Sequence, residues 1–320
     1  MLSLARHFFL KSRLVGLSCA VAMFLFVYLR IWAITFFDAR RFKQVIELFK
    51  DFEKFSPVPF DQLVTYTGRV AKSFNEPVIV FCIIIWAISR GSDTVAGQLN
   101  RGTMEILLGN PISRRRIYWV QVMVTTLGTA CLASIAWTAM TLCVYTNTVT
   151  ETIEPPELTI PGTSLTIPLS LSDPVEVEKP MSDLVDVHLF LPACTILFAM
   201  GVFVAGFTTM ISSFDRYRWR TIGITIGFVV IQQTMRILAA SKPEFEFLSN
   251  FTFYSLFDPE GLVSIYVHQY EQFWNFWLVH DDQIQRLSGL GCHVVLLGLA
   301  IVMYVIGDQA FTRRDLPAPL

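Results

Sequence analysis

The sequence predicts an all-helical integral membrane protein that crosses the bilayer six times and keeps both termini on the cytoplasmic side. Only 16% of the 320 residues are charged, whereas soluble domains carry about 25%. Apolar residues make up 53% of the chain and gather in long blocks. Lys and Arg concentrate in alternate connections between these blocks, which is the pattern of connections that face the cytosol.

Each expected span is a block of about 20 mostly apolar residues, the length that crosses the hydrocarbon core as a helix. The six blocks are 14–37, 74–90, 117–145, 187–212, 221–240 and 287–306. The first is too long for the apolar region of a signal peptide, so we expect it to stay as a span. The second is the shortest. We start it at residue 74 because Ser73 and Glu76 have capping-box spacing and Pro77 suits a first turn.

The basic residues assign the connections to the two sides of the membrane. The expected inside segments are 1–13, 91–116, 213–220 and 307–320. The outer segments 146–186 and 241–286 hold many acids and few basic side chains. The outer segment 38–73 departs from this pattern because basic and acidic side chains are mixed along it. We interpret residues 39–55 within it as an amphipathic helix on the outer membrane surface.

The two acidic outer segments differ in character. In 146–186, apolar and hydroxyl residues alternate with the period of a strand, and prolines break the alternation into short pieces. A small strand-containing cap and a disordered loop both fit this pattern. Segment 241–286 is too apolar to be simply solvated, so we expect re-entrant or interfacial helices with Trp274 and Trp277 at headgroup level.

The inside segment 91–116 predicts a short helix that projects into the cytosol. Thr103 is a suitable N-cap, and Glu105 in the first turn suits the helix dipole. Gly109 and Pro111 end the helix, and arginines flank it. From the residues alone, a docking helix for a cytosolic partner and a surface helix whose arginines bind anionic lipid are equally supported.

The run from Gly102 to Arg114, GTMEILLGNPISR, follows a Ser92-Asp93 pair and resembles the signature of the permease subunits of type-2 ABC exporters. The resemblance implies that this loop docks on a separate ATP-binding subunit. It also implies that residues 1–13 form an amphipathic elbow helix on the inner surface. One departure is Gln98, where the family usually has Glu. The implied coupling residues are Gly102, Thr103, Glu105, Leu107, Leu108, Pro111 and Arg114.

The expected function is therefore that of a multi-pass permease in the cell (inner) membrane, which moves an unidentified substrate with ATP hydrolysed elsewhere. The chain has no Gly-x4-Gly-Lys-Ser/Thr phosphate loop, so we expect the ATP-binding subunit to carry ATP and Mg. A second permease copy, identical or not, is the other expected partner, within the lipid bilayer. The alternative is a non-transporting membrane scaffold or sensor that binds partners through its outer loops.

A few polar and small residues within the spans are candidates for the pathway or for helix packing. Arg30 and Arg236 are functional candidates by default, but both lie in outer halves, and we favour side chains that reach the interface. Gly223 and Gly227 form a G-x-x-x-G that permits close approach of helices, within one subunit or in a dimer. Gln232 and Gln233 line a pathway or bond between helices, and we favour the bonding role.

Other function classes find little support in the sequence. The net charge of −1 provides no field for nucleic acid. His188 and His293 have no ligand partners in register, and the six cysteines lack metal-ligand spacing. No nucleophile–base set or carboxylate pair is present for catalysis. We therefore expect no enzyme activity, metal or cofactor in this chain.

Overall fold

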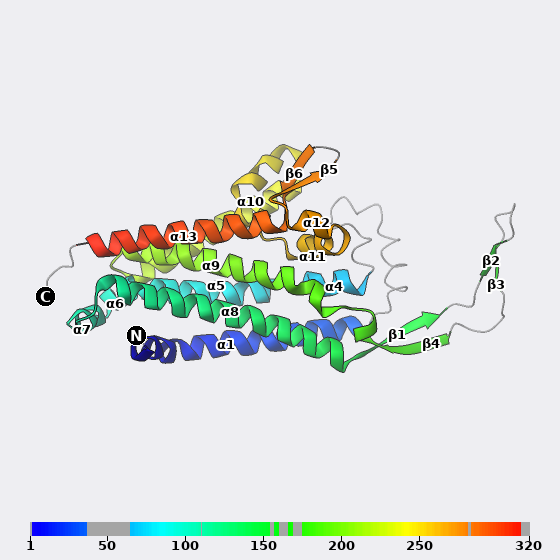
Figure 1. Cartoon of the computed structure of the whole chain (residues 1–320), viewed down its shortest axis with the longest axis horizontal. Helices are drawn as coiled ribbons and strands as arrows, with labels where there is room; N and C mark the ends of the chain where they lie inside the picture. Colours follow the sequence, from blue (N-terminus) through cyan, green and yellow to red (C-terminus); the bar gives the residue numbers. More distant parts are fainter. Residues whose placement is uncertain are drawn as a thin grey trace.

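The computed structural model describes residues 2–36, 65–109, 111–153, 157–159, 166–168, 175–280 and 283–314. These residues form a bundle of long helices (Figure 1). Six helices among the described residues are long and apolar enough to cross a membrane, and the protein is an all-α integral membrane protein with a few short strands. The spans are Ser3–Thr35, Tyr66–Thr94, Arg114–Thr146, Val187–Phe214, Arg218–Ser241 and Gly289–Arg313.

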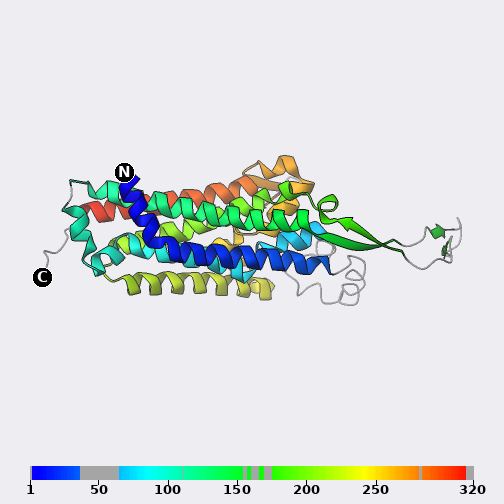
Figure 2. The ribbon, with the colours of Figure 1, turned by 90° about the horizontal axis from the view of Figure 1, so that it is seen from below.

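The six spans are built from eight of the helical elements. They are α1 (Leu2–Thr35), α4 (Tyr66–Ser73) with α5 (Pro77–Thr94), α8 (Arg114–Thr146), the 3-10 turn η3 (Val187–Phe190) with α9 (Leu191–Phe214), α10 (Arg218–Ser241) and α13 (Gly289–Arg313). Two short helices, α6 (Ala96–Asn100) and α7 (Thr103–Leu108), connect α5 to α8. Residues 1–13 and 14–37 were expected as separate helices, but α1 is continuous, and Figure 2 shows its first turns bent away from its long axis.

Helix α9 is the centre of the bundle and α10 its periphery. Within the apolar window of each span, 72% of α9 is buried inside the protein but only 11% of α10. Close packing around α9 depends on small residues. A Cβ on Gly201 would lie 2.5 Å from Thr129 of α8 and 2.6 Å from Ile83 of α5. Helix α10 therefore leaves most of its surface to lipid or to another chain.

The two ends of the bundle are different in construction. The N-terminus, the C-terminal end, α6 and α7 lie at one end in Figure 1, and the strands and the helices α11 (Pro259–His268) and α12 (Tyr270–Phe273) lie at the other. The described parts of the segments expected inside thus share one end. Following the orientation expected from the basic residues, we refer to it as the cytoplasmic end, and to the opposite end as the outer end.

The predicted start of the second span is wrong in its details. Ser73 is the last residue of α4, and its hydroxyl donates to the Arg69 carbonyl at 3.5 Å. Glu76 is itself the N-cap residue of α5, which begins at Pro77 and continues past residue 90 to Thr94. The capping box fails because Glu76 is engaged elsewhere, in an ion pair across to α1 that local spacing does not reveal.

The outer end combines strands with short helices. In residues 146–186, β1 (Thr148–Ile153) pairs antiparallel with β4 (Val175–Pro180), and β2 (Glu157–Thr159) with β3 (Thr166–Pro168). The expected amphipathic helix at 39–55 lies outside the described residues. Residues 241–286 hold the 3-10 elements η4 (Pro243–Phe251) and η5 (Phe253–Ser255), then α11 and α12. A hairpin of β5 (Trp277–His280) and β6 (Gln283–Leu287), which the apolar character of this segment did not indicate, follows them.

Candidate functional site at the cytoplasmic end

Helix α7 is a six-residue helix at the cytoplasmic tip of the molecule. Its N-cap residue is Gly102, which has φ +69°. This left-handed backbone is accessible to glycine at little cost and strains other residues. Thr103 is the first helical residue, so its predicted role as N-cap is wrong, and the glycine of the motif turns the chain instead. The helix ends at Leu108, whose side chain lies outside the described residues, and Pro111 is exposed in the connection to α8.

The side chains of α7 divide into an inward and an outward set. Met104 is 1% exposed and belongs to the main hydrophobic core, and Leu107 is half-buried. Glu105 is exposed, and Ile106 beside it is 72% exposed. An acidic and an aliphatic side chain therefore stand side by side on the outward face, while the opposite face anchors the helix to the bundle.

A buried carboxylate, Asp93 near the end of α5, organises the region behind α7. Its side chain is 6% exposed and is surrounded by cations from three elements. The Arg101 guanidinium lies 2.5 Å from Asp93 Oδ1, the Arg218 guanidinium 3.7 Å from the same oxygen, and Lys11 Nζ 3.9 Å from Oδ2. We call these four residues the Asp93 cluster. It joins α1, α5, the α6–α7 connection and the start of α10.

Gln98 extends the Asp93 cluster to α7. Its amide nitrogen donates to Asp93 Oδ2 at 3.1 Å, and its amide oxygen accepts from the Thr103 hydroxyl at 2.6 Å. A glutamate at this position would place a second carboxylate against Asp93 and would lose the amide donor. Gln98 therefore serves an internal contact here, which links α6 to the first residue of α7.

A second set of hydrogen bonds holds the end of α5 against α9 and α10. The Ser212 hydroxyl accepts from the Val95 and Ala96 amides at 3.2 and 2.9 Å. Arg218 donates to the Ser92 hydroxyl at 3.3 Å and to the Ser89 carbonyl at 3.2 Å. The Ser92-Asp93 pair thus acts as a fixed joint between the loop that carries α7 and two spans.

The N-terminal turns of α1 pack directly on this loop. Phe8, which is fully buried, forms a small cluster with Ile117, Val120 and Val124 of α8. Leu107 of α7 and Ile112 of the following connection pack against the same cluster. A displacement of α7 is therefore transmitted to α1 and α8 through side-chain contact, because packed side chains leave little room to move.

Arginines at the start of α8 tie the loop to the C-terminal end of the chain. Arg114 donates to the Arg314 carbonyl at 2.7 Å, and Arg115 pairs with Asp308 of α13 at 2.8 Å. Arg314 in turn donates to the Asp215 carbonyl at 3.0 Å. Arg114 and Arg115 therefore bond to this chain's own carbonyl and carboxylate groups, whereas Arg116 is exposed.

The polar candidates within the spans have specific partners. Arg30 of α1 donates to Glu76 at 3.2 Å, and the Arg236 guanidinium lies 5.7 Å from the centre of the Tyr254 ring. Gln232 bonds to η5: its side-chain oxygen accepts from the Phe253 amide at 3.0 Å. Gln233, the next residue, is half-buried.

The glycines of α10 do not pack within the described part of this chain. A Cβ built on Gly223 or Gly227 would meet no atom of the described residues within 4 Å. The G-x-x-x-G face thus lies on the open surface of α10, in contrast to Gly201 in α9, which is enclosed by α5 and α8.

The described residues hold no group of His, Cys, Asp or Glu with the arrangement of a metal site. His293 instead bonds the Gly289 carbonyl and the Thr195 hydroxyl at 2.7 and 2.9 Å. The cysteines are free. The sequence missed three features of the cytoplasmic end: the Asp93 cluster, the bonds of Ser212, and the exposure of Ile106. The Ser92-Asp93 pair was the one local signal that pointed to this region.

The comparisons with known proteins agree with this architecture. The sequence family described as "ABC-2 family transporter protein" matches residues 9–316, almost the whole chain. A comparison with curated proteins finds no match for the chain.

Proposed function

Because the chain belongs to the ABC-2 family of transporter proteins, we propose that it is the permease subunit of an exporter powered by a separate ATP-binding subunit. The permease supplies the membrane path and the mechanical coupling, and the partner supplies ATP hydrolysis. ATP and Mg bind to the partner, and the complex is located in the cell (inner) membrane. The chemistry of the cytoplasmic end supports this division of labour.

The observation that carries the proposal is the two-sided construction of α7. Glu105 and Ile106 face outward at the tip of the molecule, while Met104 and Leu107 anchor the helix inward. An exposed aliphatic side chain beside a carboxylate is suited to a groove with an apolar floor and a basic rim. Leu107 and Arg114 hold the loop to the bundle, and the contact surface is the Glu105–Ile106 pair.

The contacts behind α7 support a rigid transmission of force. When two ATP-binding subunits close on ATP, α7 moves with the groove that holds it. The Asp93 cluster connects that movement to α1, α5 and α10, and the Phe8 cluster connects it to α1 and α8. Packed interfaces of this kind move as bodies rather than deform locally. The spans therefore tilt together and alter access to the path.

We place a second permease copy against the open face of α10. Gly223 and Gly227 leave a shallow strip there, and small-x-x-x-small strips allow helices in lipid to approach closely. The partner copy is the same chain or a related one. A path between two copies also agrees with the low burial of α10, which is 11% in its apolar window.

The test is purification of the tagged chain from its native membranes, followed by identification of co-purifying polypeptides. We expect a polypeptide that carries a Gly-x4-Gly-Lys-Ser/Thr loop. We expect this polypeptide to be lost when Ile106 is replaced by Asp together with Glu105 by Lys. The new charge at 106 would be buried against an apolar floor, and the new cation at 105 would face a basic rim. The permease variant itself still inserts and elutes as the native chain does, since both side chains are exposed.

The matched control is Ile106→Leu, which keeps an aliphatic side chain of equal size and retains the partner. Leu107 is unsuitable for this test because it packs on the Phe8 cluster, and its replacement disturbs the permease itself. Recovery of the ATP-binding polypeptide at the native level with the double variant would show that α7 is not the docking element. Failure to recover any such polypeptide with the native chain would favour the scaffold function.

A further inference from the structure

A large cavity lies at the outer end of the bundle, away from the coupling region. It encloses about 1250 Å³, which exceeds the range of about 300–1,000 Å³ usual for small-molecule sites. Its walls come from the middle of α9 and α10, from η4 and η5, from the start of α11, from the β5–β6 hairpin and from the outer half of α13. None of the contacts described for the coupling region involves it.

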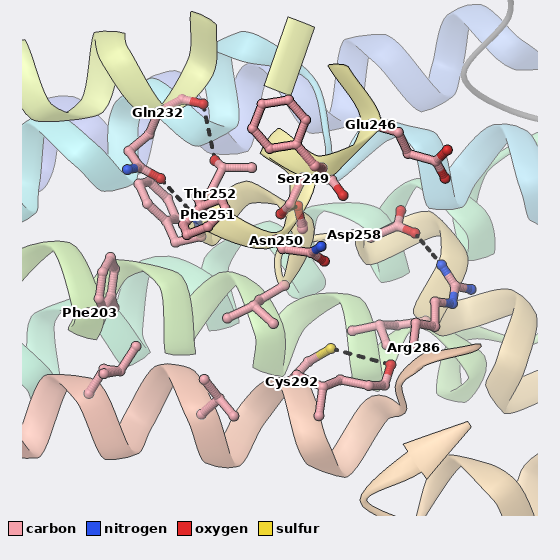
Figure 3. A pocket seen from close by; sticks show the side chains of 18 of the residues that line it. Phe203, Gln232, Glu246, Ser249, Asn250, Phe251, Thr252, Asp258, Arg286 and Cys292 are labelled. Carbon is pink, nitrogen blue, oxygen red and sulfur yellow. Dashed lines mark hydrogen bonds and ion pairs between the residues drawn. The ribbon is translucent and has the colours of Figure 1, made fainter. Parts of the chain in front are cut away.

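The lining of this cavity changes from apolar to charged along its length. The deep end has Phe203, Phe228 and Leu299, each near the middle of its span. The outer end has Glu244, Glu246, Asp258 and Arg286. Figure 3 shows this separation, with Phe203 and Cys292 on α9 and α13, and Glu246, Asp258 and Arg286 grouped away from Phe203. The cavity therefore has the polarity of an amphiphile inserted from the outer surface.

The charged end of the cavity is acidic. Asp258 and Arg286 pair with each other at 3.4 Å and neutralise one another. Asp258 also accepts from the Gly261 amide as the N-cap of α11. Glu244 and Glu246 remain as two exposed carboxylates, and Arg286 is the single cation among the described residues that line the cavity. These two carboxylates would repel an anionic ligand, whereas both would attract a cation.

Aromatic rings favour a cation further. Phe253 of η5 lies with its ring centre 5.1 Å from that of Phe203 and 5.9 Å from that of Phe228, so the three form one aromatic wall. The faces of aromatic rings attract cations, most strongly where water is excluded. Apolar groups of a ligand pack on the same wall, so a delocalised cation with an apolar surface suits both ends.

We propose that this cavity binds a lipophilic monocation, and that such an amphiphile is the class of substrate that the permease moves. The apolar body occupies the deep end against Phe203, Phe228 and Leu299, and the charge lies toward Glu244 and Glu246. The assignment of the ligand as substrate rests on the proposed transport function, but the binding itself does not require the ATP-binding subunit.

The experiment uses the full chain alone in nanodiscs of zwitterionic lipid, with tetraphenylphosphonium as the probe. Its isosteric anion, tetraphenylborate, is the chemical control. We expect saturable binding of the cation above the level of empty nanodiscs, and no saturable binding of the anion. Glu244→Gln with Glu246→Gln weakens cation binding about tenfold, since each carboxylate near the surface contributes on the order of a threefold factor.

Two substitutions in α13 test the location. Leu299→Trp fills the deep end and reduces binding at least tenfold, whereas Val302→Trp, at an exposed position on the same helix that does not line the cavity, leaves binding unchanged. Glu271→Gln on α12 is the matched charge control. Equal binding of cation and anion, or a native dissociation constant in both cavity variants, would overturn the proposal.

The role as substrate is tested with the complex. We expect tetraphenylphosphonium to stimulate ATP hydrolysis by the assembled transporter, and the Glu244/Glu246 double variant to need about tenfold more probe for the same stimulation. Binding by the permease without any stimulation of a competent complex would overturn the substrate role and leave the cation site in place. A native chain that binds the cation but associates with no ATP-binding polypeptide would instead contradict the proposed coupling function.

Discussion

Asp93 is the residue on which the cytoplasmic end depends most. Its carboxylate faces Lys11, Arg101 and Arg218, and Arg90, one turn earlier on α5, also lies within its electrostatic reach. Arg90 is 3% exposed, and its Nε and one terminal nitrogen have no hydrogen-bond partner among the described residues. One buried anion therefore serves several cations.

Replacing Asp93 by Asn leaves these cations without their carboxylate. The cost stays below the about 3–5 kcal/mol of a fully buried pair, because the side chains of Lys11, Arg101 and Arg218 are 33–35% exposed to solvent. We expect a marked drop in the thermal unfolding midpoint of the purified chain in detergent. Asp183→Asn, at an exposed outer position, serves as the control and unfolds like the native chain. Equal midpoints for the two variants would show that the cluster does not stabilise the fold.

Glu260, in the first turn of α11 outside the spans, gives the structure a pH dependence. The residue is 4% exposed, and one of its carboxyl oxygens has no hydrogen-bond partner among the described residues. Burial raises the pKa of the Glu260 carboxyl from 4.5 to about 7, with Asp258 adding to the rise and Lys72 opposing it. The protonated form is therefore the one that the folded outer end prefers.

The effect of Glu260 on stability is a decrease as the pH rises. Between pH 4.5 and 7 the folded state holds a proton that the unfolded state releases, so stability falls as the pH rises and is constant above 7. The total loss is up to about 3 kcal/mol. We expect Glu260→Gln to remove this fall, as measured by unfolding midpoints from pH 5 to 8. A native chain with a flat profile over that range would contradict the assignment.

Among the elements, α7 and the first turns of α1 form one unit. Phe8 of α1 is fully buried in a cluster with side chains of α7 and α8. Its neighbour Phe9 is 60% exposed. The two residues provide a matched comparison, because they have the same side chain on one helix, buried at Phe8 and exposed at Phe9. The contact is what makes α1 part of the coupling path rather than a separate anchor.

Phe8→Ala removes the side chain that α7, α1 and α8 share, and large-to-small changes of this kind cost about 3–5 kcal/mol. We expect faster proteolysis within residues 1–13 and weaker coupling of ATP hydrolysis to transport, with the ATP-binding subunit still attached. Phe9→Ala keeps native protease resistance and native coupling. Equal protease resistance and equal coupling in the two variants would mean that the cluster around Phe8 does not link α7 to the spans.

At the scale of elements, spans were easier to predict than their boundaries. Apolar runs such as 117–145 identify α8 because a helix in lipid must satisfy its backbone internally over a fixed length. Caps are less predictable because Ser73, Glu76 and Thr103 each have other partners available. Glu76 pairs with Arg30, 46 residues away, and Thr103 bonds to Gln98. These side-chain contacts, one long-range and one local, override the capping pattern.

For the whole molecule, the sequence predicted the six-span membrane fold and the position of the loop that carries α7. It left a strand-containing cap and a disordered loop both open for residues 146–186, where the structure has short paired strands. The Asp93 cluster could not be predicted because its members stand at positions 11, 93, 101 and 218, and only the packing of α1, α5 and α10 brings them together. The outer cavity was missed for the same reason, since its walls come from elements between α9 and α13.

The bundle has an enclosed glycine, Gly201, and two glycines on an open helix face, Gly223 and Gly227. Substitutions at the first are expected to affect folding, and substitutions at the other two to affect dimer formation. Gly201→Val collides with Thr129 and Ile83, so we expect a poorly folded chain. A Cβ at Gly223 or Gly227 meets no described atom within 4 Å, so we expect Gly223→Val with Gly227→Val to fit the folded chain. We expect this double variant to unfold at the native temperature but to lose the dimer, as measured by light scattering of the purified protein. A dimer of native mass in the double variant would exclude this face of α10 as the contact.

The most direct test of the central claim is a photo-crosslink from the tip of α7. A photo-reactive amino acid at position 106 in the native membrane is expected to capture a polypeptide with a Gly-x4-Gly-Lys-Ser/Thr loop. The same amino acid at Val267, an exposed outer position, captures no such polypeptide. Capture from position 267 but not from 106, or capture of no ATP-binding polypeptide from either, would contradict the proposed role of α7 as the coupling helix.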